Sequence, residues 1–299
     1  MRPEIARVVE LIQRKDEKSL EEALELLQGT VFSFSMKVCG QRQDAEDTMQ
    51  EVLLQSVPAL TKFDSPKALM VWLYKVAKSR CLMSRRKSKF APKEAISLEE
   101  LMPDRKELES LSGGSKATPE TAFLRRENAR RLREAVQKLP PDYRLILVLH
   151  DMEALSDEDI AEITGLRPGT IRVRLHRARL FVRKELARQN QPHRRNRSGQ
   201  AIAAKPGEAP RQRRCKEMFA ELSNYLDDTL DDSLCDELEK HMQGCEPCQA
   251  FLSTLESSVE QCRATPNAAP DPRLAAKLRR ELLDKFQQAL KGASQRAPD

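Results

Sequence analysis

The sequence predicts an all-α fold, and three observations lead to that class. Apolar residues recur with helical spacing, while no stretch alternates apolar and polar residues as a half-buried strand would. Aromatic residues make up 4% of the chain and charged residues 33%, which suits small helical bundles better than a large β core. With 299 residues, the chain is long enough for two or three bundles. We therefore expect two small helical domains, the second with a helix-turn-helix, joined by a flexible linker and followed by a small helical zinc-binding domain.

Changes in composition divide the chain into six segments. Two of them are linkers, because Pro and Gly interrupt the helical pattern there, and the second linker is also rich in Arg. The last segment carries an amphipathic helix, for which packing on another domain is favoured over binding to a membrane surface. The expected segments are a first helical domain at 1–90, a linker at 91–119, a second helical domain at 120–188, a basic linker at 189–214, an acidic domain at 215–262 and a tail at 263–299.

Charge is distributed unevenly along the chain. The formal net charge is +6, but residues 215–262 hold two basic and twelve acidic side chains, a balance of −10 that leaves +16 for the remainder. The basic part suits a polyanion such as nucleic acid, and the acidic segment resembles one. The chain is charged from Arg2 onward and has no long apolar run. We therefore expect no secretion signal, no membrane span and a cytoplasmic location.

Residues 155–186 carry the strongest local signal, which predicts two short helices with a tight turn between them. Ser156 can accept a hydrogen bond from the backbone N–H three residues on while Asp159 reaches back, a capping box that begins the first helix. Gly165 supplies the left-handed residue that ends this helix. Pro168 suits the first turn of the second helix, because its φ is fixed and it lacks a backbone donor.

The second helix of this pair is rich in arginine. Its apolar stripe, expected to pack inward, consists of Ile171, Leu175, Ala178 and Val182. The outward side fits a DNA major groove, since arginine forks suit guanine edges and phosphates and a valine can contact a thymine methyl. A solvated basic helix is the alternative, but the cap, the turn and the apolar register together favour DNA. The residues expected to point outward are Thr170, Arg172, Val173, His176 and Arg177, and the expected DNA-binding set adds Arg174 and Arg179.

The first helical domain shows two further patterns. Asp44, Asp47 and Glu51 lie on one face of a predicted helix, opposite an apolar face. The helix dipole explains acids in the first turn but not Glu51, so the stripe suits docking to a basic groove of a partner. Further along, Trp72 lies among aromatic and basic residues, a combination that holds unstacked single-stranded bases. A tryptophan is more often a core residue, so Trp72 alone assigns nothing.

The order of these motifs resembles a bacterial RNA polymerase sigma factor of the extracytoplasmic-function (ECF) type. The resemblance rests on DAED-x-x-QE at 44–51, on the F-D, WLYKVAKSR and RRK motifs between 63 and 87, and on SDEDIAEITGLRPGTIRVRLHRAR at 156–179. It covers about 29–188. Such proteins are not enzymes, and the resemblance implies that the partners of this chain are core RNA polymerase and promoter DNA.

The resemblance also implies roles for individual residues. The acidic helix would dock on the clamp of the largest polymerase subunit, the basic helix would hold the melted minus-10 element, and the arginine helix would enter the minus-35 major groove. The linker at 91–119 would thread toward the polymerase active-site channel. The implied polymerase-binding residues are Asp44, Glu46, Asp47, Gln50 and Glu51, and the implied minus-10 residues are Lys75, Lys78, Ser79, Arg80, Arg85 and Arg86.

Two departures from the family pattern concern base recognition. Where the family has Arg-Asn and then Asp four residues later, this chain has Lys78-Ser79 and Met83. Val173 stands where a small polar residue is usual. We therefore expect recognition of both promoter elements to differ from the family pattern.

The acidic segment 215–262, which we call the cysteine module, carries H-x-x-x-C-x-x-C at His241, Cys245 and Cys248. Structural zinc takes four nitrogen or sulfur ligands in a tetrahedron, and this pattern supplies three of them. The chain has seven cysteines, four of which lie in this segment between its first and its last ligand candidate. In a reducing compartment these numbers point to one structural zinc ion rather than to a disulfide framework.

The fourth zinc ligand has two candidates, Cys215 and Cys235. Cys215 opens the preceding helix, and a helix, a turn and a second helix can bring it beside His241. Cys235 lies six residues before His241, on a nearly opposite side of the same helix. This geometry favours Cys215.

The cysteine module resembles the zinc-binding anti-sigma fold, in which a Cys, an Asn-Tyr-Leu-Asp sequence (224–227 here) and the His-x-x-x-Cys-x-x-Cys pattern recur. Separate anti-sigma proteins of this fold bind a sigma factor and cover its polymerase surface. A tether of about 25 residues gives the module a high effective concentration near the other domains. We therefore expect an intramolecular contact through which the module regulates the chain in cis, with thiolate oxidation as a route of release.

Two other functional classes fit only part of the sequence. A polymerase-independent helix-turn-helix regulator with a zinc sensor leaves the acidic stripe and the aromatic-basic segment unexplained. A zinc enzyme such as a nucleobase deaminase needs a glutamate two residues after the histidine, where this chain has Gln243, and an open zinc position. The sequence therefore favours a transcription factor that is not an enzyme.

Overall fold

The computed structural model describes residues 3–14, 16–56, 60, 62–63, 65–85, 96–103, 122–190, 218–219 and 221–294. All regular secondary structure in these ranges is helical, which confirms the predicted all-α class. The chain forms two compact units, which we describe separately. The first comprises Met1–Pro92, Val148–Pro168 and Thr265–Asp299, and the second comprises Lys93–Leu147 and Gly169–Ala264. Most of the two predicted linkers, 91–119 and 189–214, lies outside the described residues.

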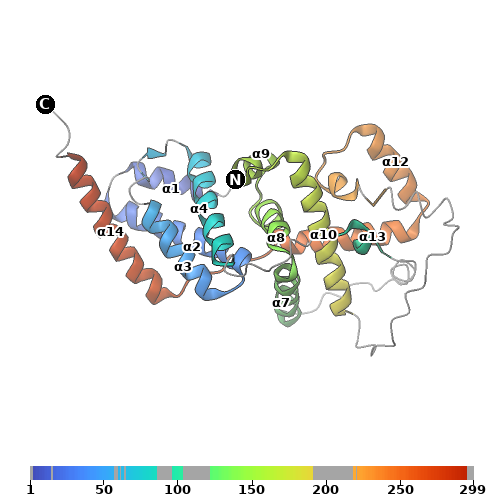
Figure 1. Cartoon of the computed structure of the whole chain (residues 1–299), viewed down its shortest axis with the longest axis horizontal. Coiled ribbons are helices and arrows are strands. Elements are labelled where there is room, and N and C mark those ends of the chain that lie inside the picture. Colours follow the sequence, from blue (N-terminus) through green and yellow to red (C-terminus); the bar gives the residue numbers. More distant parts are fainter. Residues whose placement is uncertain are drawn as a thin grey trace. The chain divides into compact units, whose positions relative to one another are not determined.

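The first unit is built on four helices from the amino-terminal part of the chain (Figure 1). Asp16 begins the second of them by accepting a hydrogen bond from the Ser19 N–H at 2.8 Å, and Gly40 ends it with φ 78°. Fully buried side chains such as Phe32 and Phe34 fill the core around this helix. The helices are α1 (Pro3–Gln13), α2 (Glu17–Cys39), α3 (Arg42–Ser56) and α4 (Pro66–Arg85).

Three later elements complete the first unit: η2 (Val148–Met152), α9 (Asp157–Thr164) and α14 (Pro272–Ser294). Ser156 caps α9 by accepting from the Asp159 N–H at 3.2 Å, and Gly165 ends it with φ 74°, as predicted. The Asp159 side chain differs from the expected capping box, because it pairs with Lys67 at 2.7 Å instead of reaching back.

The tail helix α14 packs on α2 and α3, which confirms the expectation that it covers another part of the chain. Leu278, Leu282 and Phe286 of its apolar stripe are buried. The Gln28 side-chain amide donates to the Ala275 carbonyl at 2.9 Å, so a buried polar contact fixes the register of the two helices.

Cys39 and Cys81 form a disulfide between α2 and α4, with their Cα atoms 5.6 Å apart. This differs from the prediction that the cysteines serve metal binding rather than disulfides. The two residues lie 42 positions apart, and only the packing of α2 on α4 brings them together. The sequence therefore gave no local signal for the pair.

The second unit contains α5 (Leu98–Leu101), α7 (Ala122–Lys138), α8 (Pro141–Leu147), α10 (Pro168–Asn190 in full, of which Gly169 onward belongs here), α12 (Asp232–Gln243) and α13 (Glu246–Arg263). Residues 221–226 are also helical. The predicted inward face of α10 is confirmed, because its four apolar residues are buried: Ile171, Leu175, Ala178 and Val182. Among the described residues of the whole chain, no helix has the length and hydropathy that crossing a membrane requires.

Candidate nucleic-acid interface and metal site

The acidic face of α3 has the predicted orientation. The apolar side of this helix is buried, at Ala45, Met49, Val52 and Ser56. On the other side Asp47 is exposed, while Asp44, Glu46, Gln50 and Glu51 are half-buried. Glu46 pairs with Arg42 at 2.8 Å, and Glu51 pairs with Arg80 of α4 at 2.6 Å. The structure thus presents a carboxylate surface that begins at the first turn of α3 and ends beside α4.

The basic face of α4 holds the residues that the sequence assigned to single-stranded DNA. Ser79 and Lys75 are exposed, whereas Lys78 is half-buried. The Lys78 ammonium donates to the carbonyl of Ile163 in α9 at 2.7 Å. Burial, reinforced by the nearby charge of Lys75, lowers the pKa of Lys78. The Arg85 side chain and the whole of Arg86 lie outside the described residues.

Trp72 is neither a fully buried core residue nor an isolated platform. Its ring is half-buried and lies 5.7 Å from that of Phe63, centroid to centroid, with the planes tilted by 55°. This geometry supports α4 against the preceding loop, and it leaves part of the indole accessible.

The first turn of α10 is open to solvent. Thr170 and Arg172 are exposed, and Val173 keeps 50% of its surface accessible, which is unusual for an apolar side chain. Arg174 is half-buried, with its guanidinium 6.0 Å from the ring centre of Tyr143. An exposed valine between two arginines is the surface that the sequence predicted for contact with DNA bases.

The middle of α10 contacts the cysteine module within the second unit. An intramolecular contact of the module was expected from the sequence, but the residues that make it were not. The Arg179 side chain is 0% exposed, and its two terminal nitrogens donate to the Asp227 carboxylate oxygens at 2.7 and 2.8 Å. Such a two-point pair is strong and directional. Arg263 approaches the same carboxylate at 3.4 Å. Arg179 therefore already has an anionic partner in this structure.

His176 differs most clearly from its predicted orientation, because it is buried rather than outward. Its Nδ1 lies 2.9 Å from the hydroxyl oxygen of Ser223. Burial, together with the charges of Arg179 and Arg177, lowers the pKa of His176 to about 4. The imidazole is therefore neutral at neutral pH, where it cannot act as a cation toward DNA.

Arg183 makes the third contact between α10 and the cysteine module. Its guanidinium lies 3.7 Å from the ring centre of Phe251 in α13, and its Nε donates to Thr254 at 2.8 Å. Phe219 packs on the same Phe251 ring, with centroids 4.5 Å apart. Stacking, hydrogen bonding and ion pairing thus act together along one side of α10.

A second segment lies on another side of α10, and it belongs to the predicted linker at 91–119. Residues 96–103 are ordered here, with Ile96 and Leu101 buried. The Ile96 carbonyl accepts from Arg177 at 3.2 Å, and the Glu100 carbonyl accepts from Lys184. Part of the linker that was expected to be flexible is therefore bound to α10.

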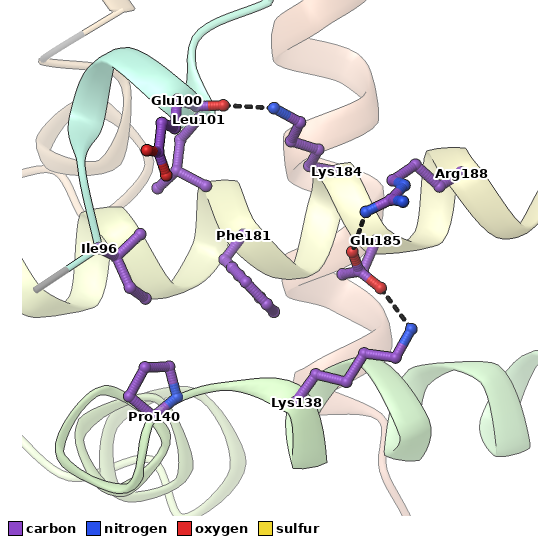
Figure 2. Close-up of a pocket in the computed structure, with 9 residues that line it drawn as sticks. All are labelled: Ile96, Glu100, Leu101, Lys138, Pro140, Phe181, Lys184, Glu185 and Arg188. Carbon is purple, nitrogen blue, oxygen red and sulfur yellow. Dashed lines mark hydrogen bonds and ion pairs between the residues drawn. The ribbon is translucent and has the colours of Figure 1, made fainter. Parts of the chain in front are cut away.

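Figure 2 shows a pocket of about 550 Å³ between this linker segment, α7 and α10. Glu185 lies at one end of the pocket, where it pairs with Lys138 at 2.6 Å and Arg188 at 3.0 Å. Side chains of Ile96 and Phe181 line the middle (Figure 2). Lys138, Lys184 and Arg188, the cations of the pocket, each have a partner within the chain.

The cysteine module brings together the three ligand candidates of the H-x-x-x-C-x-x-C pattern. The ligand atoms of His241, Cys245 and Cys248 lie within 4.8 Å of one another, and the two sulfurs are 3.3 Å apart. His241 Nε2 is 3.3 Å from the Cys248 sulfur. One imidazole nitrogen and two thiols at this separation fit three corners of a tetrahedral zinc site.

Of the two candidates for the fourth ligand, the described residues include Cys235. Cys215 lies outside them, and Cys235 is not part of the three-residue group. Cys235 is half-buried, and burial with nearby carboxylates raises the pKa of its thiol, which opposes the thiolate form that zinc requires. This observation agrees with the preference for Cys215.

Several residues that hold these surfaces together were not identified from the sequence. Ser223 was not singled out, and Asp227 appeared only as the last residue of the Asn-Tyr-Leu-Asp motif. Glu153 and Lys37 form a buried pair in the first unit, at 2.9 Å. Their partners lie between 36 and 116 positions away in the chain, so no local pattern marks them.

Comparison with known proteins adds three matches. Residues 23–90 match the family model for Sigma-70 region 2, residues 129–182 match Sigma-70, region 4, and residues 215–249 match the family described as "Putative zinc-finger". The first two families are transcription initiation factors rather than enzymes. The matched ranges contain α3 and α4, α9 and most of α10, and the His-Cys-Cys group.

Similar full-length proteins include RNA polymerase sigma-H factor of Pseudomonas aeruginosa, 30% identical over 186 residues that cover 60% of this chain and 92% of the relative. ECF RNA polymerase sigma factor SigW of Bacillus subtilis is 25% identical over 182 residues, covering 61% of this chain and 96% of the relative. The solved structure of the sigma factor RpoE in complex with the anti-sigma factor NepR from Bartonella quintana aligns with 57% of this chain and 98% of that chain, at 22% identity and a TM-score of 0.40.

Proposed function

Because this chain belongs to the bacterial RNA polymerase sigma factors of the ECF type, we propose that it binds core RNA polymerase, directs transcription initiation at specific promoters and is regulated in cis by its cysteine module. As a partner of polymerase it would act in the cytoplasm. The observation that carries the regulatory part is the buried pair between Arg179 of the DNA-reading helix α10 and Asp227 of the module.

The polymerase contact is proposed for the acidic face of α3. Asp47 is exposed there, and Asp44 and Glu51 lie on the same side of the helix, so a basic groove on the polymerase clamp can meet a row of carboxylates. The remaining residues proposed for this contact are Glu46 and Gln50. Charges of one sign along a helix also raise the rate of association with an oppositely charged surface.

Promoter DNA is proposed to bind two surfaces. Lys75, Lys78, Ser79, Arg80, Arg85 and Arg86 are proposed for the melted minus-10 strand. The first turn of α10 is proposed for the minus-35 major groove, where exposed Thr170, Arg172 and Val173 are ready for contact. Arg174, Arg177, His176 and Arg179 complete the second set, and the last three become available only when their partners within the chain leave.

The cysteine module would inhibit by competition. Asp227 offers Arg179 a carboxylate in the place where DNA would offer a phosphate or a guanine edge, and Phe251 covers the guanidinium of Arg183. The module carries a net charge of −10, so it repels the same DNA that α10 attracts. Binding of DNA along the middle of α10 and binding of the module therefore exclude each other.

Zinc is proposed as the structural ion of this module. His241, Cys245 and Cys248 would hold it, with Cys215 as the proposed fourth ligand. A zinc ion held by these residues would link the end of α12 to the start of α13, and such sites contribute directly to folding because the unfolded chain lacks them. The ion would thus keep α13, with Phe251 and Thr254, in position against α10.

A binding measurement with core RNA polymerase tests the central proposal. We expect the full chain to bind core polymerase, and Asp47→Lys to weaken this binding by about tenfold, because it reverses an exposed charge at the proposed contact. Glu21→Lys is the matched control, since Glu21 is exposed on α2 and undergoes the same charge change. Failure of the wild-type chain to bind polymerase would instead favour a regulator that acts on DNA alone.

A further inference from the structure

Residues 148–164, which belong to the sigma region 4 match, fold back on α2 and α4 of the first unit. The anchor of this contact is Glu153, whose side chain is 0% exposed. One of its oxygens accepts from the Lys37 ammonium at 2.9 Å, and the other accepts from the Tyr74 hydroxyl at 2.6 Å. Tyr74 in turn packs edge-on against Phe34 in the core. A buried carboxylate with two short hydrogen bonds is a directional attachment, not an accidental contact.

Helix α9 then runs along the basic side of α4. Three lysines of α4 each contact it: Lys67 pairs with Asp159 at 2.7 Å, Lys75 lies 3.7 Å from Glu162, and Lys78 donates to the Ile163 carbonyl at 2.7 Å. Spacings of eight and three residues place these lysines on one side of α4. The last contact uses a carbonyl at the carboxyl end of α9, where the helix dipole is negative.

The covered side of α4 is the one that the proposed function assigns to melted promoter DNA. Lys75 and Lys78 belong to that set. In this structure two carboxylates and one carbonyl oxygen occupy the positions that DNA phosphates would take opposite the lysines. Contact with α9 also buries part of Lys78, which lowers its pKa and separates it from solvent.

We propose that α9 closes the minus-10 surface of the free protein, that Glu153 is the anchor of this closure, and that the surface opens only when polymerase and promoter bind. This inference rests on the proposed function, because it takes α4 as a promoter-binding helix. It uses none of the contacts between the cysteine module and α10.

The closure lowers the affinity of the free protein for single-stranded DNA in a defined way. DNA binds only the open form. The measured affinity is therefore the affinity of the open form multiplied by the fraction of protein that is open. Once open, the Glu153 carboxylate and the Lys37 ammonium both reach water, so separation does not leave a charge buried without a partner. Such a contact can open and close without unfolding either side.

The test measures binding of a short fluorescein-labelled single-stranded oligonucleotide of mixed sequence to the full chain at low salt. Glu153→Gln keeps the shape of the anchor but removes its charge, and we expect about tenfold tighter binding, since a hydrogen bond to a charged group is worth enough to shift the equilibrium by that factor. Lys67→Glu places two acids opposite each other at the edge of the contact. We expect it to bind more tightly too, although it removes a positive charge.

Lys62→Glu is the matched control for Lys67→Glu. Lys62 is exposed just before α4, and the change in net charge is the same, but the contacts with α9 described above are made by Lys67, Lys75 and Lys78. We expect its binding to be equal to or weaker than that of the wild type. Emission of Trp72, the single tryptophan, and the thermal midpoint report whether α4 stays folded in each variant.

The outcomes separate this inference from the proposed function. If Lys67→Glu is folded and binds the oligonucleotide no more tightly than Lys62→Glu, α9 does not close the surface. If the wild type already binds as tightly as Glu153→Gln, the anchor has no such role. If neither the wild type nor any variant supports initiation with core polymerase, the proposed function itself is contradicted, whatever the oligonucleotide binding shows.

Discussion

The two terminal nitrogens of Arg179 lie 2.7 and 2.8 Å from the two carboxylate oxygens of Asp227, and the arginine side chain has no exposed surface. Arg179 lies on the helix that we propose reads DNA, and while it is buried and paired with this acid it cannot contact DNA. Removing one partner of a buried pair is costly only while the other stays buried. Here Arg179 regains solvent when the module leaves, so loss of Asp227 favours release.

Asp227→Asn should therefore increase binding to duplex promoter DNA. The variant keeps the shape of the side chain but loses the charge that pairs with Arg179, and we expect about tenfold tighter DNA binding and higher transcription with core polymerase. Asp228→Asn is the control, because Asp228 is the exposed neighbour and asparagine tolerates its left-handed backbone, φ 52°. Equal DNA binding by Asp227→Asn and wild type would contradict regulation through this pair.

Acid should weaken the contact between α10 and the cysteine module. The pKa of His176 is lowered from 6.5 to about 4 in the folded contact, so the released form binds a proton first as pH falls. The stabilisation present above pH 6.5 is lost between that value and about 4, and roughly 2 kcal/mol should be lost by pH 5. The groups around the ring are Ser223, Arg179 and Arg177.

Protease sensitivity of the module as a function of pH measures this effect. His176→Gln should remove the part of the pH dependence that belongs to this site, while any acid release of zinc would persist in both proteins. A variant with the same pH profile as wild type would show that His176 does not control the contact.

Reduction should destabilise the first unit. The Cys39–Cys81 bond closes a loop with a sequence separation of 42, for which loop entropy predicts a contribution of about 4 kcal/mol. Thermal unfolding with and without a thiol reductant measures it, and we expect a lower midpoint in the reduced protein. Cys39→Ser should unfold at the reduced midpoint under both conditions. A reductant effect that persists in Cys39→Ser would assign the effect to other cysteines.

Metal analysis should find about one zinc ion per chain. We expect Cys248→Ser to lose it and Cys235→Ser to retain it, because only the former lies in the His-Cys-Cys group. Cys215→Ser should also lose zinc if it supplies the fourth ligand. Retention of zinc by Cys215→Ser together with loss in Cys235→Ser would reverse the assignment. Chelation should raise DNA binding as Asp227→Asn does, since both release α10.

Local features were predictable from the sequence because their causes are local. The Ser156 cap, the left-handed Gly165 and the inward face of α10 follow from short-range spacing, and the structure has all three. The apolar face of α3 follows from the same rule. The meeting of His241 with Cys245 and Cys248 follows from a spacing of four and three residues.

Long-range contacts were not predictable for the same reason. His176 was expected to face solvent because the prediction used only the apolar face of its own helix. Its hydrogen-bond partner Ser223 lies 47 positions away in the chain. Lys37 and Glu153 are 116 positions apart. The local sequence around Lys37 or Glu153 contains no pattern that predicts the other residue. Such charge pairs can therefore be identified only from the tertiary structure.

Helix α9 has two roles in this molecule, because it directly precedes α10, the proposed promoter-reading helix, and also packs on α4. A substitution at Asp159 or Glu162 is expected to weaken the packing of α9 on α4 in the free protein. Through the same helix it would also change the support of α10. The low DNA affinity of the free protein and its promoter preference are thus coupled, and a substitution that changes one is expected to change the other.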